Sequence, residues 1–292
     1  MSSSNLKSPY SDRPDPYFRG HVDRVVIEEE DLLGLNVGYE CSAWRYEAFA
    51  SFLFEWLVEF TTSFSDLRKL THGNLVRMVS RAANTVYNTD KYRKRGEFGE
   101  LLLHAILREL FDTEPAVSKL FYKSAINDTV KGFDAVHVRK NRFGDVELWL
   151  GEVKFYSSIT EAIKSVTSEI ADHLRAAKMH EEFMCVGKLV DENWEFAPYV
   201  KKLFDRNTSL DEVFRCVCIP VLLTYESSVV QDAREISNEF IKKLKVEFYK
   251  IQKDFKAKAP ATKVKIHLIL LPIESKEKLV STLNEKLTGW QR

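Results

Sequence analysis

Two long apolar segments place the strongest constraint on how this chain can fold. Residues 216–225, CVCIPVLLTY, are almost continuously apolar, and residues 262–273, TKVKIHLILLPI, also have strand character. A strand whose successive side chains are apolar is buried on both faces, as in the centre of a sheet covered by helices. Between them, residues 232–256 carry apolar side chains at helical spacing. The sequence therefore predicts a layered α/β fold.

The order of the remaining elements refines this fold class. From residue 96 onward the pattern predicts helix, strand, strand, helix, strand, helix, strand and helix. This order gives a mixed central sheet flanked by helices. We expect residues 1–85 to form an N-terminal extension, with a flexible arm, a short strand near 23–29 and helices over 42–64 and roughly 74–88. Residues 86–292 would form the main domain.

Composition limits the classes of function. The chain has 292 residues, 45% of them hydrophobic and 29% charged, and its formal net charge is zero. A chain of this size buries a substantial core, and these fractions are typical of soluble globular proteins. A neutral protein that binds nucleic acid depends on a local basic patch or on a partner. Its polar N-terminus and four scattered cysteines predict a cytoplasmic protein with reduced thiols.

Residues 47–64, EAFASFLFEWLVEFTTSF, are apolar enough to suggest a membrane helix. However, polar side chains recur every four residues, at Glu47, Ser51, Glu55 and Glu59. This spacing produces one narrow polar stripe on an apolar helix. A buried helix, or a helix at a protein interface, is therefore expected in place of a membrane span.

The segment LWLGEVKFYSS, residues 148–158, contains the charged residues that most need an explanation. It has the pattern of an interior strand, but Glu152 and Lys154 stand two residues apart within it. Because strand side chains alternate between faces, these two share a face. Burying both charges is costly unless each finds a partner or a metal ion.

A β-hairpin over residues 131–156 supplies one partner. The numbers of Asp134 and Glu152 sum to 286, which places the two residues opposite one another across a turn centred on Phe143, next to Gly144. Directly opposed residues have Cβ atoms about 5 Å apart and point to the same face. The hairpin thus brings Asp134, Glu152 and Lys154 together, provided that the register is not shifted.

Two adjacent carboxylates repel each other, and a hard divalent cation such as Mg²⁺ (or Mn²⁺) relieves this repulsion. We expect Asp134 and Glu152 to bind the ion with help from the Val153 carbonyl oxygen. The ion can polarise a phosphoryl oxygen and acidify a bound water. Lys154 can orient that water or stabilise charge on the phosphate. This set of groups is sufficient to hydrolyse a phosphodiester.

The helix that begins near Gly96 offers a further acid. Glu97 and Glu100 lie three residues apart on nearly the same face, and His104 follows four residues later. Acids in a first helical turn are favoured by the helix dipole alone, so a purely structural role is an alternative. Glu100 is the preferred site residue, because the adjacent Leu101 and Leu102 direct that part of the helix to the core. Glu97 remains an option.

These segments resemble the PD-(D/E)XK nuclease superfamily. In that superfamily one strand carries an acid, the next carries (D/E)-x-K, and an upstream helix carries another acid. GFDAVHV supplies Asp134, GEVKFY supplies Glu152 and Lys154, and GEFGE supplies Glu100 or Glu97. The superfamily's proline is absent, since Phe133 precedes Asp134. The resemblance implies a restriction-endonuclease-like core with an N-terminal helical extension.

More narrowly, residues 90–180 resemble the HamA family of the bacterial Hachiman antiphage system. That resemblance implies a nuclease effector acting on DNA and restrained by a partner helicase, HamB. The second hypothesis is a silent, non-catalytic nuclease fold that serves as a binding or regulatory subunit of a helicase.

Structural alternatives apply to several of these residues. Asp134, Glu152 and Lys154 could form only an ion cluster at a strand end. His137 lies on the opposite strand face from Asp134 and is expected to pack in the core. For Lys164 and His173, on the following helix, a solvated face is the default. Finally, basic residues could form a rim beside the site that binds the nucleic-acid backbone, namely residues 91–95, Lys131, Arg139, Lys140 and Arg142.

Overall fold

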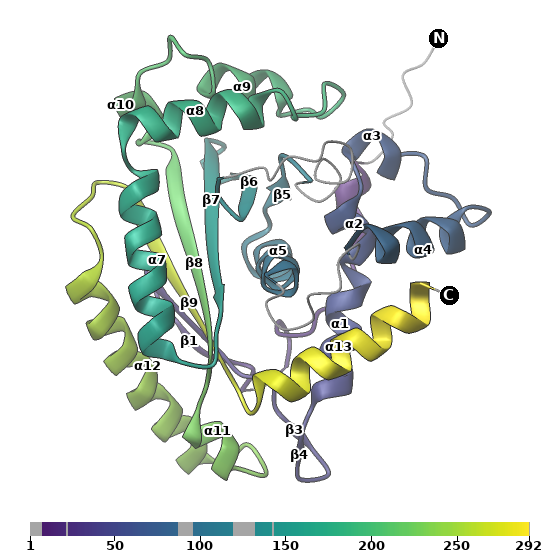
Figure 1. Ribbon diagram of the computed structural model, residues 1–292, viewed down its shortest axis with the longest axis vertical. Helices are drawn as coiled ribbons and strands as arrows, with labels where there is room; N and C mark the ends of the chain where they lie inside the picture. Colours follow the sequence, from purple (N-terminus) through teal and green to yellow (C-terminus); the bar gives the residue numbers. More distant parts are fainter. Residues whose placement is uncertain (1–7, 22, 87–95, 119–131, 142, 292) are drawn as a thin grey trace.

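The computed structural model describes residues 8–21, 23–86, 96–118, 132–141 and 143–291. A single mixed sheet of seven strands runs through the molecule, with helices on both of its faces (Figure 1). The predicted fold class, a mixed central sheet flanked by helices, is therefore confirmed.

Parallel strands form the centre of this sheet and antiparallel strands its edges. The strands are β1 (Val25–Glu28), β2 (Leu32–Leu35), β5 (Glu114–Pro115), β6 (Ala135–Lys140), β7 (Val146–Phe155), β8 (Val217–Glu226) and β9 (Lys265–Ile273). Their spatial order is β1-β2-β9-β8-β7-β6-β5. Strands β2, β9, β8 and β7 are parallel neighbours, whereas β1, β6 and β5 are antiparallel to theirs. Strands β3 (Tyr39–Glu40) and β4 (Ala43–Trp44) form a separate ladder.

Two long helices cover one face of the sheet, α7 (Ile159–His173) and α12 (Asn238–Lys258). Each begins at a serine whose hydroxyl accepts a hydrogen bond from a first-turn N–H group, Ser158 for α7 and Ser237 for α12. The predicted apolar face of α12 is buried, including Phe240, Leu244 and Phe248. Helices α7 to α10 lie between β7 and β8, and α11 and α12 lie between β8 and β9, so both parallel pairs have the helical crossover that they require.

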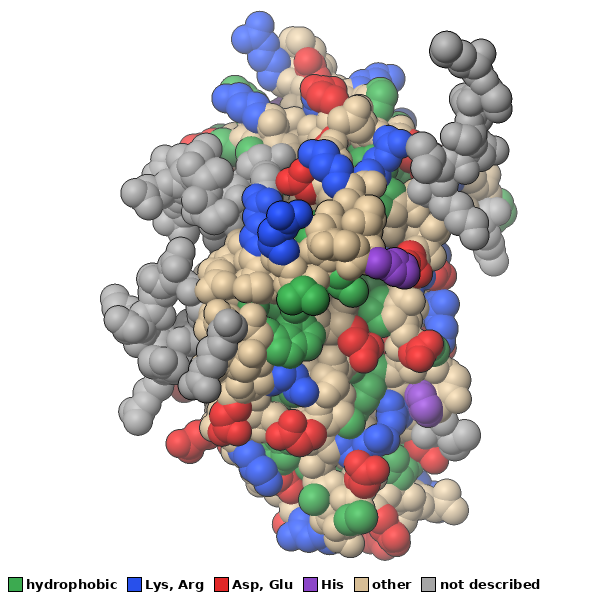
Figure 2. Space-filling model, turned by 90° about the vertical axis from the view of Figure 1, so that its right-hand side faces the viewer, with side chains coloured by type: hydrophobic (Ala, Val, Ile, Leu, Met, Phe, Trp, Pro, Cys, Tyr) green, Lys and Arg blue, Asp and Glu red, His purple; other side chains and the backbone are tan. Residues whose placement is uncertain are grey.

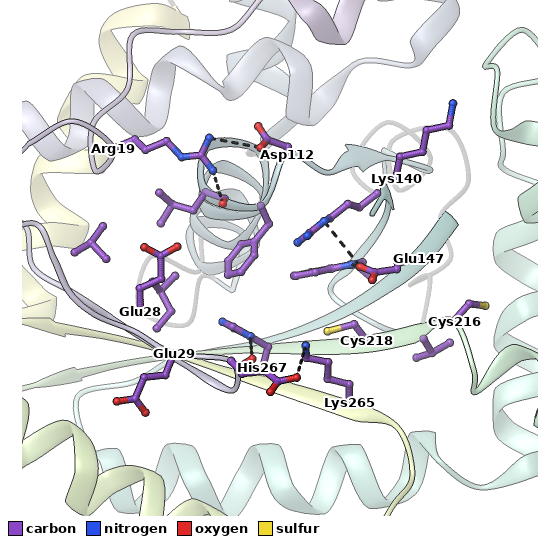
Figure 3. A pocket seen from close by; sticks show the side chains of 18 of the residues that line it. Arg19, Glu28, Glu29, Asp112, Lys140, Glu147, Cys216, Cys218, Lys265 and His267 are labelled. Atoms are coloured by element: carbon purple, nitrogen blue, oxygen red, sulfur yellow. Dashed lines mark hydrogen bonds and ion pairs between the residues drawn. The ribbon is translucent and has the colours of Figure 1, made fainter. Parts of the chain in front are cut away.

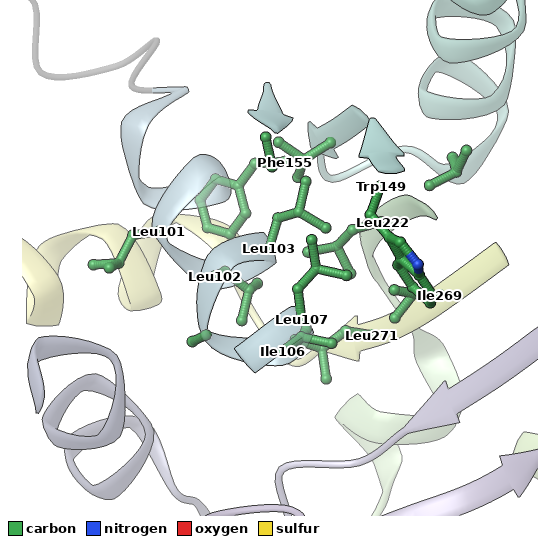
Figure 4. Close-up of a cluster of buried hydrophobic side chains, with 14 of the residues drawn as sticks. Leu101, Leu102, Leu103, Ile106, Leu107, Trp149, Phe155, Leu222, Ile269 and Leu271 are labelled. Atoms are coloured by element: carbon green, nitrogen blue, oxygen red, sulfur yellow. The ribbon is translucent and has the colours of Figure 1, made fainter. Parts of the chain in front are cut away.

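Helix α5 (Glu97–Phe111) lies against the other face (Figure 4). Leu103, Ile106 and Leu107 form a buried cluster with side chains of β7, β8 and β9, namely Trp149, Leu222 and Ile269. The approach is close at Gly151, where a Cβ would lie 2.8 Å from a methyl carbon of Leu103. Glycine at this position therefore allows α5 to approach closely the strand that carries Glu152.

The remaining helices lie around α5 or on the side of the sheet that carries α7 and α12. They are η1 (Pro9–Ser11), α1 (Tyr46–Glu55), α2 (Leu57–Thr61), α3 (Phe64–Leu67), α4 (Leu75–Val86), α8 (Ala176–Gly187), α9 (Ala197–Leu203), α10 (Leu210–Val213), α11 (Ser228–Asp232) and α13 (Lys276–Gln291). Helices α1, α2, α4 and α13 contact one another on the side of α5 (Figure 1). The last turn of the chain thereby packs against the N-terminal helices.

The prediction of a single helix over residues 42–64 was wrong. Residues 43–44 belong to β4, and the helical segment divides at Trp56, whose indole is almost fully buried. Glu59, in α2, does not lie on an exposed stripe: its side chain is 11% exposed and contacts Arg108 with both carboxylate oxygens. The buried guanidinium thereby gains the carboxylate partner that its burial requires. No helix among the described residues is long and apolar enough to span a membrane.

The N-terminal region shares the core of the rest of the chain. Strands β1 and β2 extend the main sheet by pairing β2 with β9. The described part of the expected flexible arm is packed, because Tyr10 and Phe18 are buried in the same hydrophobic cluster. The boundary expected between residues 85 and 86 adjoins residues 87–95, which lie outside the described part.

Candidate functional site

A cavity of about 660 Å³ lies where β7 ends and the helices α5, α7 and α13 begin. Glu100, Asp134, Val153 and Lys154 all line it. These residues come from three segments that are separated in the sequence. The cavity also lies beyond the carboxyl end of a parallel strand, the usual position of ligand sites in open α/β sheets.

The predicted hairpin register is confirmed. Ala135 pairs with Gly151 and Val138 with Leu148, so paired residue numbers sum to 286 along the ladder. At the turn, Asn141 N–H donates to the Asp145 carbonyl oxygen at 2.8 Å, and Gly144 has a φ of 87° that favours glycine. The register explains why Asp134 and Glu152 are brought together.

Asp134 lies one residue before β6 and is fixed by the backbone of the neighbouring strand. Its Oδ2 atom accepts a hydrogen bond from Val153 N–H at 3.0 Å. The carboxylate is therefore positioned by the residue that separates Glu152 from Lys154. Val153, between the two predicted site residues, thus has a structural role through its backbone N–H group, which its apolar side chain does not indicate.

Glu152 is buried, with 1% of its surface exposed, on the α7 face of the sheet. One carboxylate oxygen lies 3.0 Å from His173 Nε2, and the other lies 3.9 Å from Lys154 Nζ. Burial raises the pKa of Glu152 to about 7, Asp134 acts in the same direction, and His173 opposes the change. The ionised form of Glu152 is therefore less favoured in the folded protein than in water.

His173 is a site neighbour that the sequence reasoning placed on a solvated face, and that expectation was wrong. The imidazole is buried between Glu152 and Glu182, with Nδ1 2.7 Å from a Glu182 oxygen. Its ring stacks on Phe133 at a centroid distance of 4.4 Å. Burial alone would lower the pKa of His173, but the two carboxylates outweigh it and raise the pKa to about 9.

A sequence signal for this position existed. The apolar face of α7 includes Ile163, Val166 and Ile170, and His173 continues that spacing by three residues. A titratable residue on a buried helical face requires a polar partner. Lys164, the other residue of this helix for which a solvated face was predicted, is exposed as expected.

Lys154 is held by a carboxylate of α7. Its ammonium group forms an ion pair with Glu169, whose second oxygen accepts a hydrogen bond from the Ser165 hydroxyl at 3.0 Å. Burial would lower the pKa of Lys154, but Glu169, Glu152 and Asp134 together raise it above the usual value. Lys154 is therefore a charged donor at neutral pH.

The two candidate helical acids differ in position. Glu100 is buried in the first turn of α5 and lines the cavity, whereas Glu97 is not among the lining residues. His104, one turn further, points elsewhere, with Nε2 3.1 Å from Glu59. His137 packs in the core as expected, with Nδ1 2.8 Å from the Thr113 hydroxyl.

The expected basic rim does not include Arg139 and Lys140. Both line a different cavity, of about 550 Å³, at the amino ends of β7, β8 and β9 (Figure 3). They stand at the far end of β6 from Asp134, so β6 itself separates them from the site. The other members of that rim, residues 91–95, 131 and 142, lie outside the described residues. On the face that carries α4 and α13, basic and acidic side chains are interspersed (Figure 2).

Comparison with known proteins identifies the family. The model of the HamA family matches residues 15–287, which is most of the chain. The chain belongs to the HamA family. Its sequence is similar to anti-bacteriophage protein A of Escherichia coli strain K12, with 23% identity over 283 residues. The alignment covers 92% of this chain but 50% of that relative, so the chain spans half the length of the curated protein it matches.

In this member of the HamA family, the donor atoms near the cavity suit a hard cation. Asp134, Glu152 and Glu100 offer carboxylate oxygens and Val153 a carbonyl oxygen, which are the ligand types of Mg²⁺ and Mn²⁺. Within the described residues, no group of three or more His, Cys, Asp or Glu side chains is already arranged around an ion position. Glu152 and Lys154 are instead engaged with residues of α7. Water would therefore have to complete the coordination of a bound ion.

Proposed function

We propose that this chain is a metal-dependent nuclease of the PD-(D/E)XK type that acts on DNA in the defence of a bacterial cell against phage, in the cytoplasm. The observation that carries the proposal is the convergence of Glu100, Asp134 and Lys154 on one cavity, with Glu152 beside it. The name of the E. coli relative, anti-bacteriophage protein A, supports the biological role.

Each residue has a distinct task in the proposed mechanism. Asp134, Glu152 and the Val153 carbonyl would hold Mg²⁺ (or Mn²⁺), which supplies Lewis acidity toward a phosphoryl oxygen and a water. Lys154 positions the attacking water and stabilises charge on the phosphate. Val153 N–H keeps the Asp134 carboxylate in place. Glu100 would help to hold the ion through a water molecule.

The pairing within the site favours a restrained resting state. Glu152 contacts His173, and Lys154 contacts Glu169, so side chains of α7 occupy both motif residues. This observation supports the second candidate function, a silent nuclease-fold subunit held by a helicase partner of the HamB type. In that form the chain would become active, or would only bind, within a heterocomplex.

A cleavage assay tests the proposal. Purified chain is incubated with labelled linear DNA and RNA in Mg²⁺, in Mn²⁺ and in EDTA. We expect metal-dependent cleavage of DNA, and a loss of at least about 100-fold in Glu152→Ala and Lys154→Ala, because ligand and water positioning act in the transition state. Glu147→Ala is the matched control, since Glu147 lies at the other end of the same strand.

The outcomes separate the two candidate functions. Cleavage by Glu152→Ala at the wild-type rate would exclude the assigned site. An inert wild-type chain that cleaves only after its genomic neighbour is added would establish the restrained subunit. A chain that remains inert in both conditions, while binding the neighbour, would leave only the non-catalytic role.

A further inference from the structure

A second lysine, from the opposite end of the sequence, faces the same cavity. Lys276 is the first residue of α13 and lines the cavity with Lys154, Asp134 and Glu100. Its ammonium nitrogen lies 5.4 Å from the ring centroid of Phe155 and 5.7 Å from that of Tyr156. Those aromatic residues directly follow Lys154 in the sequence. The side chain therefore crosses the end of the strand that carries the E-x-K motif.

The charge of Lys276 differs from that of Lys154 in how it is balanced. Lys154 is paired with Glu169, whereas the described residues place no carboxylate oxygen within ion-pair distance of Lys276 Nζ. The nearby Glu226 carboxylate instead accepts the backbone N–H of Lys276, at 2.8 Å. Burial lowers the pKa of Lys276, and Glu226 opposes that change. Its ammonium is thus partly desolvated.

The charged groups around the cavity indicate which kind of ligand Lys276 binds. The other charged side chains that line the cavity include the acids Glu100, Asp134 and Glu161. Helices α5, α7 and α13 all begin at this cavity, and the amino end of a helix carries partial positive charge. A phosphate that enters a cavity with acidic side chains on its wall is stabilised by a cation that forms no direct ion pair with a carboxylate. Lys276 is such a cation.

We infer that Lys276 binds a backbone phosphate of the nucleic-acid strand that enters the cavity, and so acts as a second phosphate contact beside Lys154. The inference rests on the proposed function and names a residue outside the E-x-K motif. Lys276 is a binding residue that contacts substrate and not a group that takes part in proton transfer. The C-terminal helix α13 thereby contributes directly to the site.

The test uses Lys276→Met, which keeps the aliphatic stem against Phe155 and Tyr156 and removes the charge. The matched control is Lys278→Met. This substitution removes the same charge from the same helix. The Lys278 ammonium lies over the Tyr46 ring, 4.4 Å from the centroid, and Lys278 does not line the cavity. Binding of a fluorescein-labelled DNA 20-mer is measured by anisotropy at several salt concentrations, in a Glu152→Gln background that prevents cleavage.

We expect Lys276→Met to weaken binding by about tenfold and to reduce the slope of log affinity against log salt by about 0.7 to 0.9, as expected for one lost phosphate contact. Lys276→Arg should retain most of the affinity, and Lys278→Met should match its parent. Thermal melting should show that all variants are folded.

Equal affinity and salt slope in Lys276→Met and its parent would overturn the inference, as would an equal loss in Lys278→Met. Either result can coexist with metal-dependent cleavage by the wild-type chain, so the proposed function would survive. A wild-type chain that neither binds nor cleaves nucleic acid, both alone and after its genomic neighbour is added, would overturn both.

Discussion

Two buried clusters of ionisable groups lie on opposite faces of the sheet, and they differ in how their charges are balanced. The Arg108 cluster comprises Glu59, His104 and Arg108 on the α5 side. The Glu152 cluster comprises Glu152, Lys154 and His173 on the α7 side, together with the α7 carboxylate Glu169 and the α8 carboxylate Glu182.

Each cluster contains a buried glutamate, but the two pKa values shift in opposite directions. Burial would raise the pKa of Glu59, but Arg108 and His104 outweigh it, and the pKa falls below the usual value. Burial dominates at Glu152 and raises the pKa to about 7. Arg108 donates to both oxygens of Glu59, whereas Lys154 stands 3.9 Å from Glu152. A fully compensated pair indicates a structural role, and a poorly compensated one marks a functional site.

Substitution of Arg108 should produce the largest decrease in the free energy of unfolding. Arg108 has no exposed surface, and its guanidinium also donates to the carbonyl oxygens of Tyr10 and Thr113. Arg108→Leu leaves Glu59 buried without its cation, so we expect the free energy of unfolding to fall by about 3 to 5 kcal/mol. Denaturant titration followed by circular dichroism measures this.

Two variants provide the contrast. Glu152→Gln should lower the free energy of unfolding by much less than Arg108→Leu does, because burial raises the pKa of Glu152 and its ionised form therefore opposes folding at neutral pH. Arg175→Leu, from an exposed pair with Asp172, should change the free energy of unfolding by less than about 1 kcal/mol. If Arg108→Leu were no less stable than Arg175→Leu, the structural role assigned to the Arg108 cluster would be wrong.

The free energy of unfolding should depend on pH through the Glu152 cluster, and this effect should be smaller than that of Arg108→Leu. The pKa of His173 is raised to about 9, so the folded chain binds a proton there more tightly than the unfolded chain does. This contribution is complete below the unfolded value near 6.5 and is lost as the pH rises through 9. In metal-free buffer we expect His173→Gln to remove a stability change on the order of 2 kcal/mol between pH 6.5 and 9.

The measurement is the free energy of unfolding of wild type and His173→Gln at several pH values across this window. His104 provides the control, because burial lowers its pKa and it adds no stability that would be lost over the same window. Parallel pH profiles for wild type and His173→Gln would show that His173 is not charged in the folded protein.

Removing the Glu169 carboxylate that pairs with Lys154 should give the smallest change in stability and only a modest change in cleavage rate. Glu169 is partly exposed, with 43% of its side-chain surface accessible, so its ion pair with Lys154 contributes at most about 1 kcal/mol to stability. Glu169→Gln frees the ammonium for the cavity, and we expect the initial rate of DNA cleavage to rise by roughly two- to fivefold. Ser165→Ala, which keeps the carboxylate, is the control. A large fall in rate in Glu169→Gln would place Glu169 in the catalytic machinery instead.

The hairpin shows why part of the site could be predicted from the sequence. The side-chain period of a strand is two residues, and the Asn-Gly-Asp turn fixes the register, so Asp134 and Glu152 are matched by local rules alone. The central strands were predictable for a similar reason, because burial on both faces imposes continuous apolar runs on β8 and β9.

Other features depended on contacts between distant segments. The inward turn of Glu59 depends on Arg108, which is 49 residues away. The burial of His173 depends on Glu152 from β7 and Glu182 from α8. Lys276 enters the cavity because α13 follows the end of β9, which lies two strands from β7. The helical spacing of α7 indicates that His173 is buried, but no local pattern identifies the distant partners in any of these contacts.

The layered fold, the hairpin and the pairing of an acid with the E-x-K strand follow from side-chain alternation and turn geometry, so the amino-acid sequence is enough to predict them. The helical acid that lines the cavity, the carboxylates that hold Lys154 and His173, and the C-terminal lysine of the site emerge only in the folded chain. The cost of burying a charge depends on all groups that pack around it, and folding brings those groups together from distant parts of the chain.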